Sequence, residues 1–288
     1  MGKTSEEHIG ETPDELRVPE FQSLSELCEY FDLGQLIETK TLEGGSESRT
    51  ACLITSRGKY ILKTYLTGSL EKLAIEADFL EFLKRNNFKC GAVHSPEVFI
   101  FDGSYSLIFN FVEGSHPEIN LKNLGVLGVQ TATFHQLSAI FPGVKGLQNE
   151  NDTLPKFYIH RDLCRENIIQ NDEDFYFIDF EDLRIDTPVR DIVRIIETWC
   201  VGDAGEIDVD RVNLFIEEYE KSRPLSEAEK RQIPGLFESL LMSKLNYRSS
   251  TYAREQDPVK KEKLRLSVIH TQKMIDAFTR DRSILENL

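Results

Sequence analysis

The segment of residues 157–182 constrains the fold and the chemistry of this 288-residue chain more than any other. A first apolar run ends in a His-x-Asp motif whose acid is Asp162, and Asn167 follows five positions later. After a polar turn, a second apolar run ends in Asp179. Phosphoryl transfer requires such a set, because one carboxylate must orient the acceptor hydroxyl while an amide and a second carboxylate hold Mg²⁺ against the nucleotide phosphates. The segment therefore predicts a reaction as well as a local structure.

The side chains of this segment have distinct expected roles. Asp162 is the predicted general base, which accepts a proton from the substrate hydroxyl or orients it. Asn167 and Asp179 are the predicted metal ligands, since oxygen-only ligation suits Mg²⁺. His160 is expected to brace the loop rather than react, and Arg161 to pair with a phosphate or a carboxylate. The alternative is an ordinary hairpin with polar ends, which the histidine, the flanking strands and the spacing of the second acid disfavour.

Two features upstream of this segment have the composition of a nucleotide-binding site. The paired glycines of Gly44-Gly45-Ser46 would let backbone N–H groups close over phosphates, although such a run alone is more often an ordinary turn. Lys63 lies inside the apolar strand predicted next along the chain. It needs a partner there, because burying its charge alone is costly, unless it is an edge-strand lysine that reaches water.

The partner of Lys63 is expected on the following helix, which is predicted from Ser69 to about Arg85. In kinases, a lysine at this position contacts the α- and β-phosphates and a glutamate of that helix. Glu76, on the edge of the apolar face of the helix, is the preferred candidate. Glu81 borders the other edge and remains the alternative.

Two later residues have both a functional and a structural interpretation. Asp191 falls twelve residues after Asp179, and it is expected either to accept backbone hydrogen bonds from the catalytic loop or to be an exposed acid at a helix start. Trp199, the only tryptophan, is expected to be a core aromatic rather than a cation–π wall for an ammonium group.

Composition excludes several classes of function. A net charge of −15 argues against nucleic-acid binding, and no apolar run approaches the ~20 residues that span a membrane. Five cysteines without a CxxC pair favour reduced thiols in the cytoplasm and give no reason to expect a zinc site. Acids that follow Trp199 hint at a cationic acceptor, although an acidic chain has acids everywhere; they are Asp203, Glu206, Asp208 and Asp210.

The pattern of the chain predicts two lobes after a loosely ordered segment at residues 1–22. Residues 23–113 carry strand-like runs at 50–54, 59–65, 98–101 and 104–111. The first helix of this lobe is predicted at residues 23–31, with Ser23 as its N-cap and Gly34 at its end. Residues 114–288 are mostly helical, with helices expected at 122–139, 188–200, 209–221, 226–247 and 258–280.

These motifs resemble those of the aminoglycoside phosphotransferase and choline kinase superfamily, which shares the protein-kinase fold. The resemblance covers roughly residues 23–280, and the His-x-Asp and Ile-Asp-Phe-Glu motifs are its specific part. It implies a two-lobed α+β fold, with a small N-terminal antiparallel sheet plus one helix and a larger, mostly helical C-terminal lobe. Adenine would then hydrogen-bond to the backbone near Asn110, Phe111 and Val112. Residues 186–191 and 219–229 further resemble the spore-coat kinase-like branch.

The resemblance implies an ATP- and Mg²⁺-dependent phosphotransferase that acts on a hydroxyl of an aminoglycoside, a sugar, an amino alcohol or a homoserine-like compound. A protein kinase is the close alternative, since the catalytic loop fits its signature. Against it, Cys164 and Glu181 stand where protein kinases have lysine and glycine, and only eleven residues separate Asp179 from Asp191. A non-catalytic nucleotide-binding protein of the same fold is the third possibility.

Overall fold

The computed structural model describes residues 18–42, 48–144 and 154–288. The described residues form two compact units. One contains the residues up to Ala77 together with Val93–Phe109, and the other contains Asp78–Ala92 together with Asn110–Leu288. The functional boundaries expected after residues 22 and 113 remain a prediction, because compactness alone does not define functional lobes.

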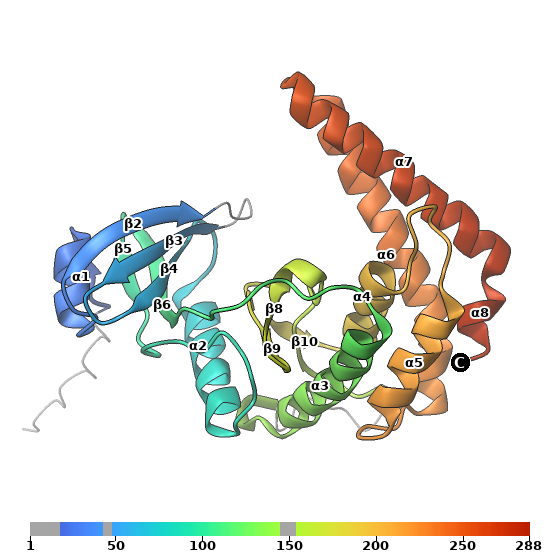
Figure 1. Cartoon of the computed structure of the whole chain (residues 1–288), viewed down its shortest axis with the longest axis horizontal. Helices are drawn as coiled ribbons and strands as arrows, with labels where there is room; N and C mark the ends of the chain where they lie inside the picture. Colours follow the sequence, from blue (N-terminus) through green and yellow to red (C-terminus); the bar gives the residue numbers. More distant parts are fainter. Residues whose placement is uncertain (1–17, 43–47, 145–153) are drawn as a thin grey trace, which may run out of the picture. The chain divides into compact units, whose positions relative to one another are not determined.

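The first unit is built on a six-stranded sheet with the order β1-β5-β6-β4-β3-β2 (Figure 1). Antiparallel pairing joins β2 to β3, β3 to β4 and β5 to β6. The strands are β1 (Glu20–Phe21), β2 (Leu36–Leu42), β3 (Ser48–Thr55), β4 (Lys59–Tyr65), β5 (Phe99–Phe101) and β6 (Ser104–Asn110).

Strand β1 adds one parallel pair to the expected antiparallel sheet, because it lies parallel to β5. It also falls within residues 1–22, which the sequence predicted to be loosely ordered. Phe21 is buried and packs edge-on against Phe99 of β5, with their ring centroids 5.5 Å apart, and it also contacts Phe31. Burial of this aromatic ring accounts for the extra parallel strand.

The sheet is accompanied by α1 (Leu24–Tyr30) and by the start of α2 (Leu70–Arg85), the two helices that the sequence predicted near 23–31 and 69–85. The Ser23 side chain accepts a hydrogen bond from the Glu26 N–H, as a helix N-cap does. Helix α1 ends at Tyr30, with Phe31 as its C-cap, rather than at Gly34. Asp32 has a left-handed φ of 54°, which lets the Leu33 N–H donate to the Cys28 carbonyl.

The second unit is mostly helical, as expected, with two short β-ribbons (Figure 1). Strand β7 pairs with β10, and β8 pairs with β9. The strands are β7 (Phe157–Ile159), β8 (Ile168–Asn171), β9 (Asp174–Phe177) and β10 (Arg184–Asp186). The helices are α3 (Leu121–Ile140), α4 (Val189–Trp199), α5 (Val209–Glu220), α6 (Glu227–Arg254), α7 (Pro258–Asp281) and α8 (Ser283–Glu286), with 3-10 turns at Pro142–Val144 and Arg165–Asn167.

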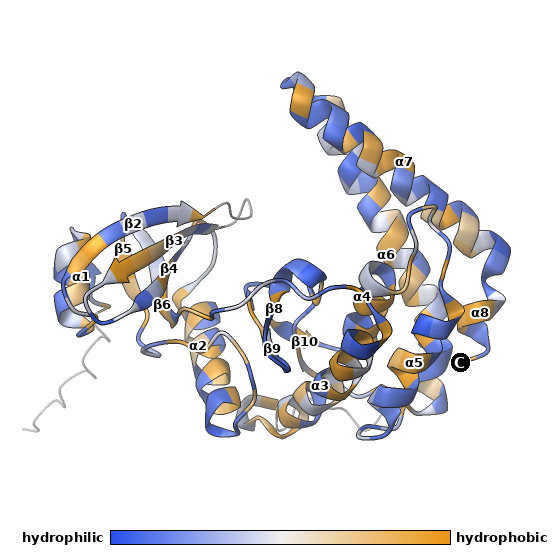
Figure 2. Cartoon of the chain, viewed as in Figure 1, coloured by the Kyte–Doolittle hydropathy of each residue, from blue (hydrophilic) through white to orange (hydrophobic). Residues whose placement is uncertain are grey.

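Helices α6 and α7 form a long antiparallel hairpin. Hydrophobic and hydrophilic residues are interspersed along both helices (Figure 2), and the buried residues of α6 lie between Glu229 and Leu241. Ser226 and Glu229 form a capping box at the start of α6, and the Asp257 side chain caps α7. In the part of the chain that the structure describes, no helix is long and apolar enough to cross a membrane.

The chain enters the helical region through Gly114, which lies directly against β8. Gly114 has a φ of +141°, and a Cβ there would lie 2.2 Å from the carbonyl oxygen of Gln170. Ser115 and Gln170 then exchange two backbone hydrogen bonds, of 3.1 and 2.8 Å. Only glycine permits this approach, so the residues just before it are fixed relative to the β8–β9 ribbon.

Candidate active site

The β8–β9 ribbon brings two predicted metal ligands to one end of its paired strands. Ile168 is paired with Phe177, and the Ile178 N–H donates to the carbonyl of Asn167 at 3.0 Å. Asp179 follows directly, in a left-handed conformation with a φ of 64°. The ribbon thus holds Asn167 and Asp179 on neighbouring strand ends, although they are twelve residues apart in sequence.

His160 braces the catalytic loop. It is fully buried against Phe180, with the ring centroids 4.5 Å apart. Its Nε2 donates to the carbonyl of Ile178 at 2.9 Å, and its Nδ1 accepts from the N–H of Asp162 at 3.3 Å. Since both ring nitrogens are used by the main chain, His160 links the residue before one predicted ligand to the backbone of the predicted base.

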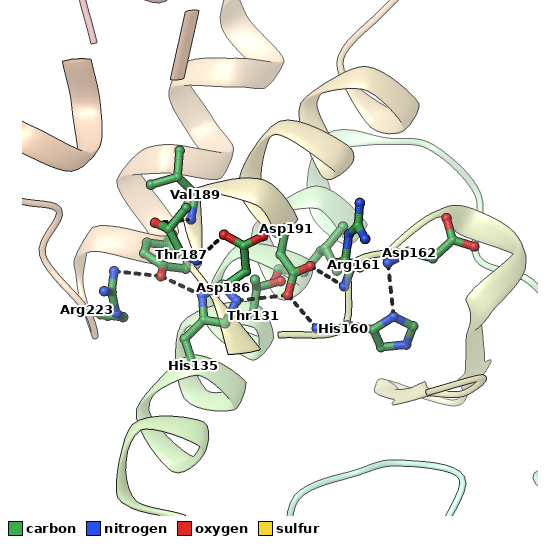
Figure 3. A network of polar contacts seen from close by, with 12 residues as sticks. Thr131, His135, His160, Arg161, Asp162, Asp186, Thr187, Val189, Asp191 and Arg223 are labelled. Carbon is green, nitrogen blue, oxygen red and sulfur yellow. Dashed lines mark hydrogen bonds and ion pairs between the residues drawn. The ribbon is translucent and has the colours of Figure 1, made fainter. Parts of the chain in front are cut away.

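Asp191 of α4 also holds the catalytic loop in place (Figure 3). Its carboxylate is fully buried and accepts from the N–H of His160 at 2.9 Å and from the N–H of Arg161 at 2.6 Å. These are the backbone hydrogen bonds expected of Asp191, and it is not an exposed acid. They hold Arg161 at a φ of 69°, a conformation that costs a residue with a side chain about 1 kcal/mol.

The Asp162 side chain has a different partner on each carboxylate oxygen. Oδ2 accepts from the Asn167 amide at 2.9 Å. Oδ1 accepts from Arg194 of α4, with 2.9 Å to Nε and 2.7 Å to Nη2. The side chain remains 39% exposed, so a hydroxyl can still reach it from solvent.

Arg194 is itself held in a buried row of alternating charges. Its Nη1 donates to Glu197 at 2.5 Å, and Lys244 of α6 donates to the same glutamate oxygen at 2.6 Å. Burial alone would lower the pKa of Arg194, but Glu197 and Asp162 outweigh it and raise the pKa, so the guanidinium stays charged. Burial, aided by Arg194, lowers the pKa of Lys244 against the opposing effect of Glu197.

Cys164, the only thiol in the catalytic loop, is buried. Burial, followed by the negative charge of Asp162, raises the pKa of the Cys164 thiol to about 12. The thiol form is a poor nucleophile, so the cysteine fills space in the loop.

Lys63 and Glu76 are both buried in the first unit and share Tyr65 as a neighbour. The Lys63 ammonium lies 5.2 Å from the centroid of the Tyr65 ring, and the Tyr65 hydroxyl donates to Glu76 at 2.7 Å. Glu81 instead forms ion pairs with Lys84 and Arg85 on its own helix. The geometry thus favours Glu76 over Glu81 as the helix partner of Lys63.

The remaining nucleotide-binding candidates have mixed outcomes. Gly44, Gly45 and Ser46 lie outside the described residues. The N–H of Asn110 donates to the Ala92 carbonyl at 3.0 Å, so this donor is already used. The contacts with adenine expected of Phe111 and Val112 remain a prediction.

Sequence reasoning did not identify Arg194, Glu197 or Lys244. Asp191, Arg194 and Glu197 recur every three positions on a helix that is otherwise apolar on its buried side. Charges at that spacing lie near one another on a helix, and this spacing was the signal in the sequence that could have identified Arg194 and Glu197. Trp199 is fully buried beside Phe175 and is a core aromatic, as expected.

Comparison with known proteins supports the assignment of this site to phosphoryl transfer. A family model described as the phosphotransferase enzyme family matches residues 145–225, which contain the whole catalytic segment. The homoserine kinase of Paramagnetospirillum magneticum is 25% identical, over 78% of this chain and 85% of the relative. The homoserine kinase of Rhodopseudomonas palustris is also 25% identical, over 82% and 88%.

Solved structures share the fold. An amicoumacin kinase in complex with AMP-PNP, Ca²⁺ and Ami has a TM-score of 0.69 and 14% identity, covering 87% of this chain and 93% of its own. A microcompartment-associated aminopropanol kinase has a TM-score of 0.65 and 15% identity, covering 91% and 98%. Fold and site together define a small-molecule phosphotransferase with a protein-kinase-like fold. The chain is similar to the aminoglycoside phosphotransferase and choline kinase superfamily, through the phosphotransferase match over residues 145–225 and the homoserine kinase relatives.

Proposed function

We propose that the protein transfers the γ-phosphate of ATP to a hydroxyl of a small compound that carries an amine, and that homoserine and short amino alcohols are the first candidates. The observation that carries this proposal is the Asp162 carboxylate, which is partly exposed and held between Arg194 and Asn167. The acceptor class is supported by the relatives, which are named homoserine kinases, and by the aminopropanol kinase that shares the fold.

The residues fit a magnesium ion. The Asn167 Nδ2 donates to Asp162, which turns the amide so that its Oδ1 remains as an oxygen ligand. Asp179, on the adjacent strand end, adds a carboxylate, and oxygen donors are what Mg²⁺ prefers. When bound, the ion would neutralise the negative charge of the phosphates during transfer.

In this proposal, the protein's own residues position and deprotonate the acceptor. Asp162 accepts the hydrogen bond of the acceptor hydroxyl, orients its oxygen toward the phosphorus and takes its proton as the new P–O bond forms. Lys63, oriented by Glu76, binds the α- and β-phosphates, and the backbone at Phe111 and Val112 binds adenine. His160 and Asp191 hold the loop in which Asp162 lies.

A protein acceptor is disfavoured by the short connection after Asp179. Strand β10 begins at Arg184 and pairs with β7, and α4 begins at Val189. These described residues leave no room for the extended segment on which protein kinases hold a peptide. This supports a small acceptor over the protein-kinase alternative.

The proposal is tested by ADP release with homoserine, aminopropanol, ethanolamine and an aminoglycoside, for the wild type, Asp162→Asn and Asp162→Ala. Both variants should lose about 10²–10⁴-fold in kcat, the usual contribution of a general base. Their affinity for AMP-PNP, measured by calorimetry, should stay close to that of the wild type.

Asp174→Asn is the matched control, because Asp174 is half-exposed on β9 and pairs only with Lys89 among the described residues. It should turn over like the wild type. Turnover of Asp162→Ala at the wild-type rate would show that the mechanism is wrong.

A further inference from the structure

The Arg194 guanidinium is the only cation that contacts the Asp162 carboxylate among the described residues. Nε and Nη2 both donate to Oδ1, at 2.9 and 2.7 Å. The two hydrogen bonds from the planar guanidinium fix the position of Oδ1. Oδ2 is meanwhile positioned by the Asn167 amide.

All three guanidinium nitrogens of Arg194 contact acids, since Nε and Nη2 donate to Asp162. Its remaining Nη1 donates to Glu197, whose side chain is only 7% exposed. The Arg194 side chain is 14% exposed and lies between two acids. These contacts favour a role in holding Asp162 over a role in binding substrate.

The same helix that holds the main chain of the catalytic loop also holds its base. Asp191, three residues before Arg194 on α4, accepts the N–H groups of His160 and Arg161. Helix α4 therefore holds both the backbone of the catalytic loop and the side chain of Asp162. Lys244 completes the support, since it binds the Glu197 oxygen that Arg194 also binds and so ties α6 to the row.

We infer that Arg194 is a positioning residue for the phosphotransfer reaction, which holds Asp162 in line with the acceptor hydroxyl and is itself held by Glu197 and Lys244. This inference rests on the proposed function. In this inference, Lys244 and Glu197 hold Arg194, and Arg194 holds the partly exposed Asp162.

The test compares Arg194→Ala and Arg194→Lys with the wild type in the same ADP-release assay. Arg194→Ala should lower kcat by about 10²-fold, the effect of misplacing a catalytic group by about 1 Å. Its KM for ATP should change by less than about threefold, since Arg194 does not contact the nucleotide in this assignment. Arg194→Lys keeps the charge but loses the two-pronged contact, so its kcat should lie between the two.

Chemical rescue separates positioning from folding. Ethylguanidine should restore part of the kcat of Arg194→Ala, because it matches the part of the side chain that this substitution removes between Asp162 and Glu197. Arg211→Ala is the matched control, since Arg211 is a partly buried arginine that pairs with Asp208 and does not contact the catalytic loop. It should keep wild-type kcat and show no response to ethylguanidine.

Three outcomes are distinct. Loss of kcat with rescue supports the inference. Wild-type kcat in Arg194→Ala, or a loss that ethylguanidine leaves unchanged in a folded variant, overturns the inference while the proposed function stands. Absence of turnover by the wild type with every acceptor overturns both.

Discussion

His135 shows how a single buried side chain can extend the support of the active-site loop. It is fully buried, and its Nε2 lies 3.1 Å from Asp191 while its Nδ1 lies 2.7 Å from the Tyr219 hydroxyl. Arg223 donates to the same hydroxyl at 2.9 Å. Asp191 can only accept, so the hydrogen bonds of this chain run in one direction. Arg223 donates to the Tyr219 hydroxyl, and this hydroxyl donates to Nδ1 of His135. His135 carries its proton on Nε2 and donates it to Asp191. A second proton on His135 would break this order.

The pH dependence of stability should therefore carry a contribution from His135. Burial lowers the pKa of His135, and Arg223 adds to this, against the opposing effect of Asp191 and Glu229. In the unfolded chain its pKa is near 6.5. As the pH falls below about 6.5, the unfolded state binds the proton first, so the free energy of unfolding decreases until the pH passes the folded-state pKa. Above about 7 the contribution should be constant.

The measurement is urea unfolding of the wild type and His135→Gln between pH 5 and 8. Trp199 is the only tryptophan and lies in the same unit, so its fluorescence reports the unfolding of that unit. The wild type should lose more stability than His135→Gln between pH 7 and 5. Parallel curves for the two proteins would contradict the assignment.

At the residue scale, the sequence was sufficient where a contact is local and insufficient where it is not. Asp162, Asn167 and Asp179 were identified because motif spacing and strand ends bring them together. Arg194 was not, since its contact with Asp162 spans 32 residues and depends on how α4 packs. Buried partners of this kind become visible only when the tertiary structure is known.

At the scale of elements, two glycines in helices have opposite packing. A Cβ on Gly128 of α3 would lie 2.8 Å from the Phe215 carbonyl and 2.9 Å from Cβ of Glu218, both on α5. A Cβ on Gly235 of α6 would meet nothing within 4 Å. Gly128 is therefore required by the close approach of two helices, while Gly235 only adds conformational freedom to the unfolded chain.

Alanine substitution should move stability in opposite directions at these positions. Gly235→Ala should stabilise the protein by about 0.5–1 kcal/mol, the usual gain in a helix interior. Gly128→Ala should destabilise it by about 1–3 kcal/mol, the cost of overpacking, because the atoms it meets include backbone. Gly125→Ala is the control, since its Cβ would lie 3.7 Å from Glu218, an ordinary contact. Thermal unfolding of the three variants measures these changes in stability. Destabilisation by Gly235→Ala, or no loss of stability in Gly128→Ala, would contradict the packing described for the two glycines.

Elements were predictable to the extent that their pattern was strong. The five long helices of the second unit were expected within a few residues, apart from the C-terminal end of α6, which extends to Arg254. Strand β2 was missed because it is an exposed edge strand with Glu38 and Lys40 on it, so it lacks the alternation of a half-buried strand. Strand β1 was missed because a strand of two residues is too short to show the alternation of apolar and polar residues that predicts a strand.

At the scale of the whole molecule, net charge is a poor guide to the chemistry of the site. The chain carries 49 acidic and 34 basic residues, which had hinted at a cationic acceptor. Around the proposed base, however, Asp162 and Glu197 alternate with Arg194 and Lys244, and these four charges sum to zero. Local contacts at the base therefore bear on the choice of acceptor in addition to the average field.

Nucleotide binding should stabilise the folded chain in a manner that requires magnesium. A ligand that binds only the folded state adds RT ln(1 + [L]/Kd), which is about 2.7 kcal/mol at 100 times Kd. AMP-PNP with Mg²⁺ should therefore raise Tm well above the value found with Mg²⁺ alone or with AMP-PNP and EDTA. Asp179→Asn should abolish most of the magnesium-dependent part, because it removes a carboxylate from the proposed oxygen ligands. Asp174→Asn, on the same ribbon but paired with Lys89, should respond like the wild type. An equal rise in Tm for wild type and Asp179→Asn would mean that the nucleotide is bound without the metal site, and that Asp179 has another role in the loop.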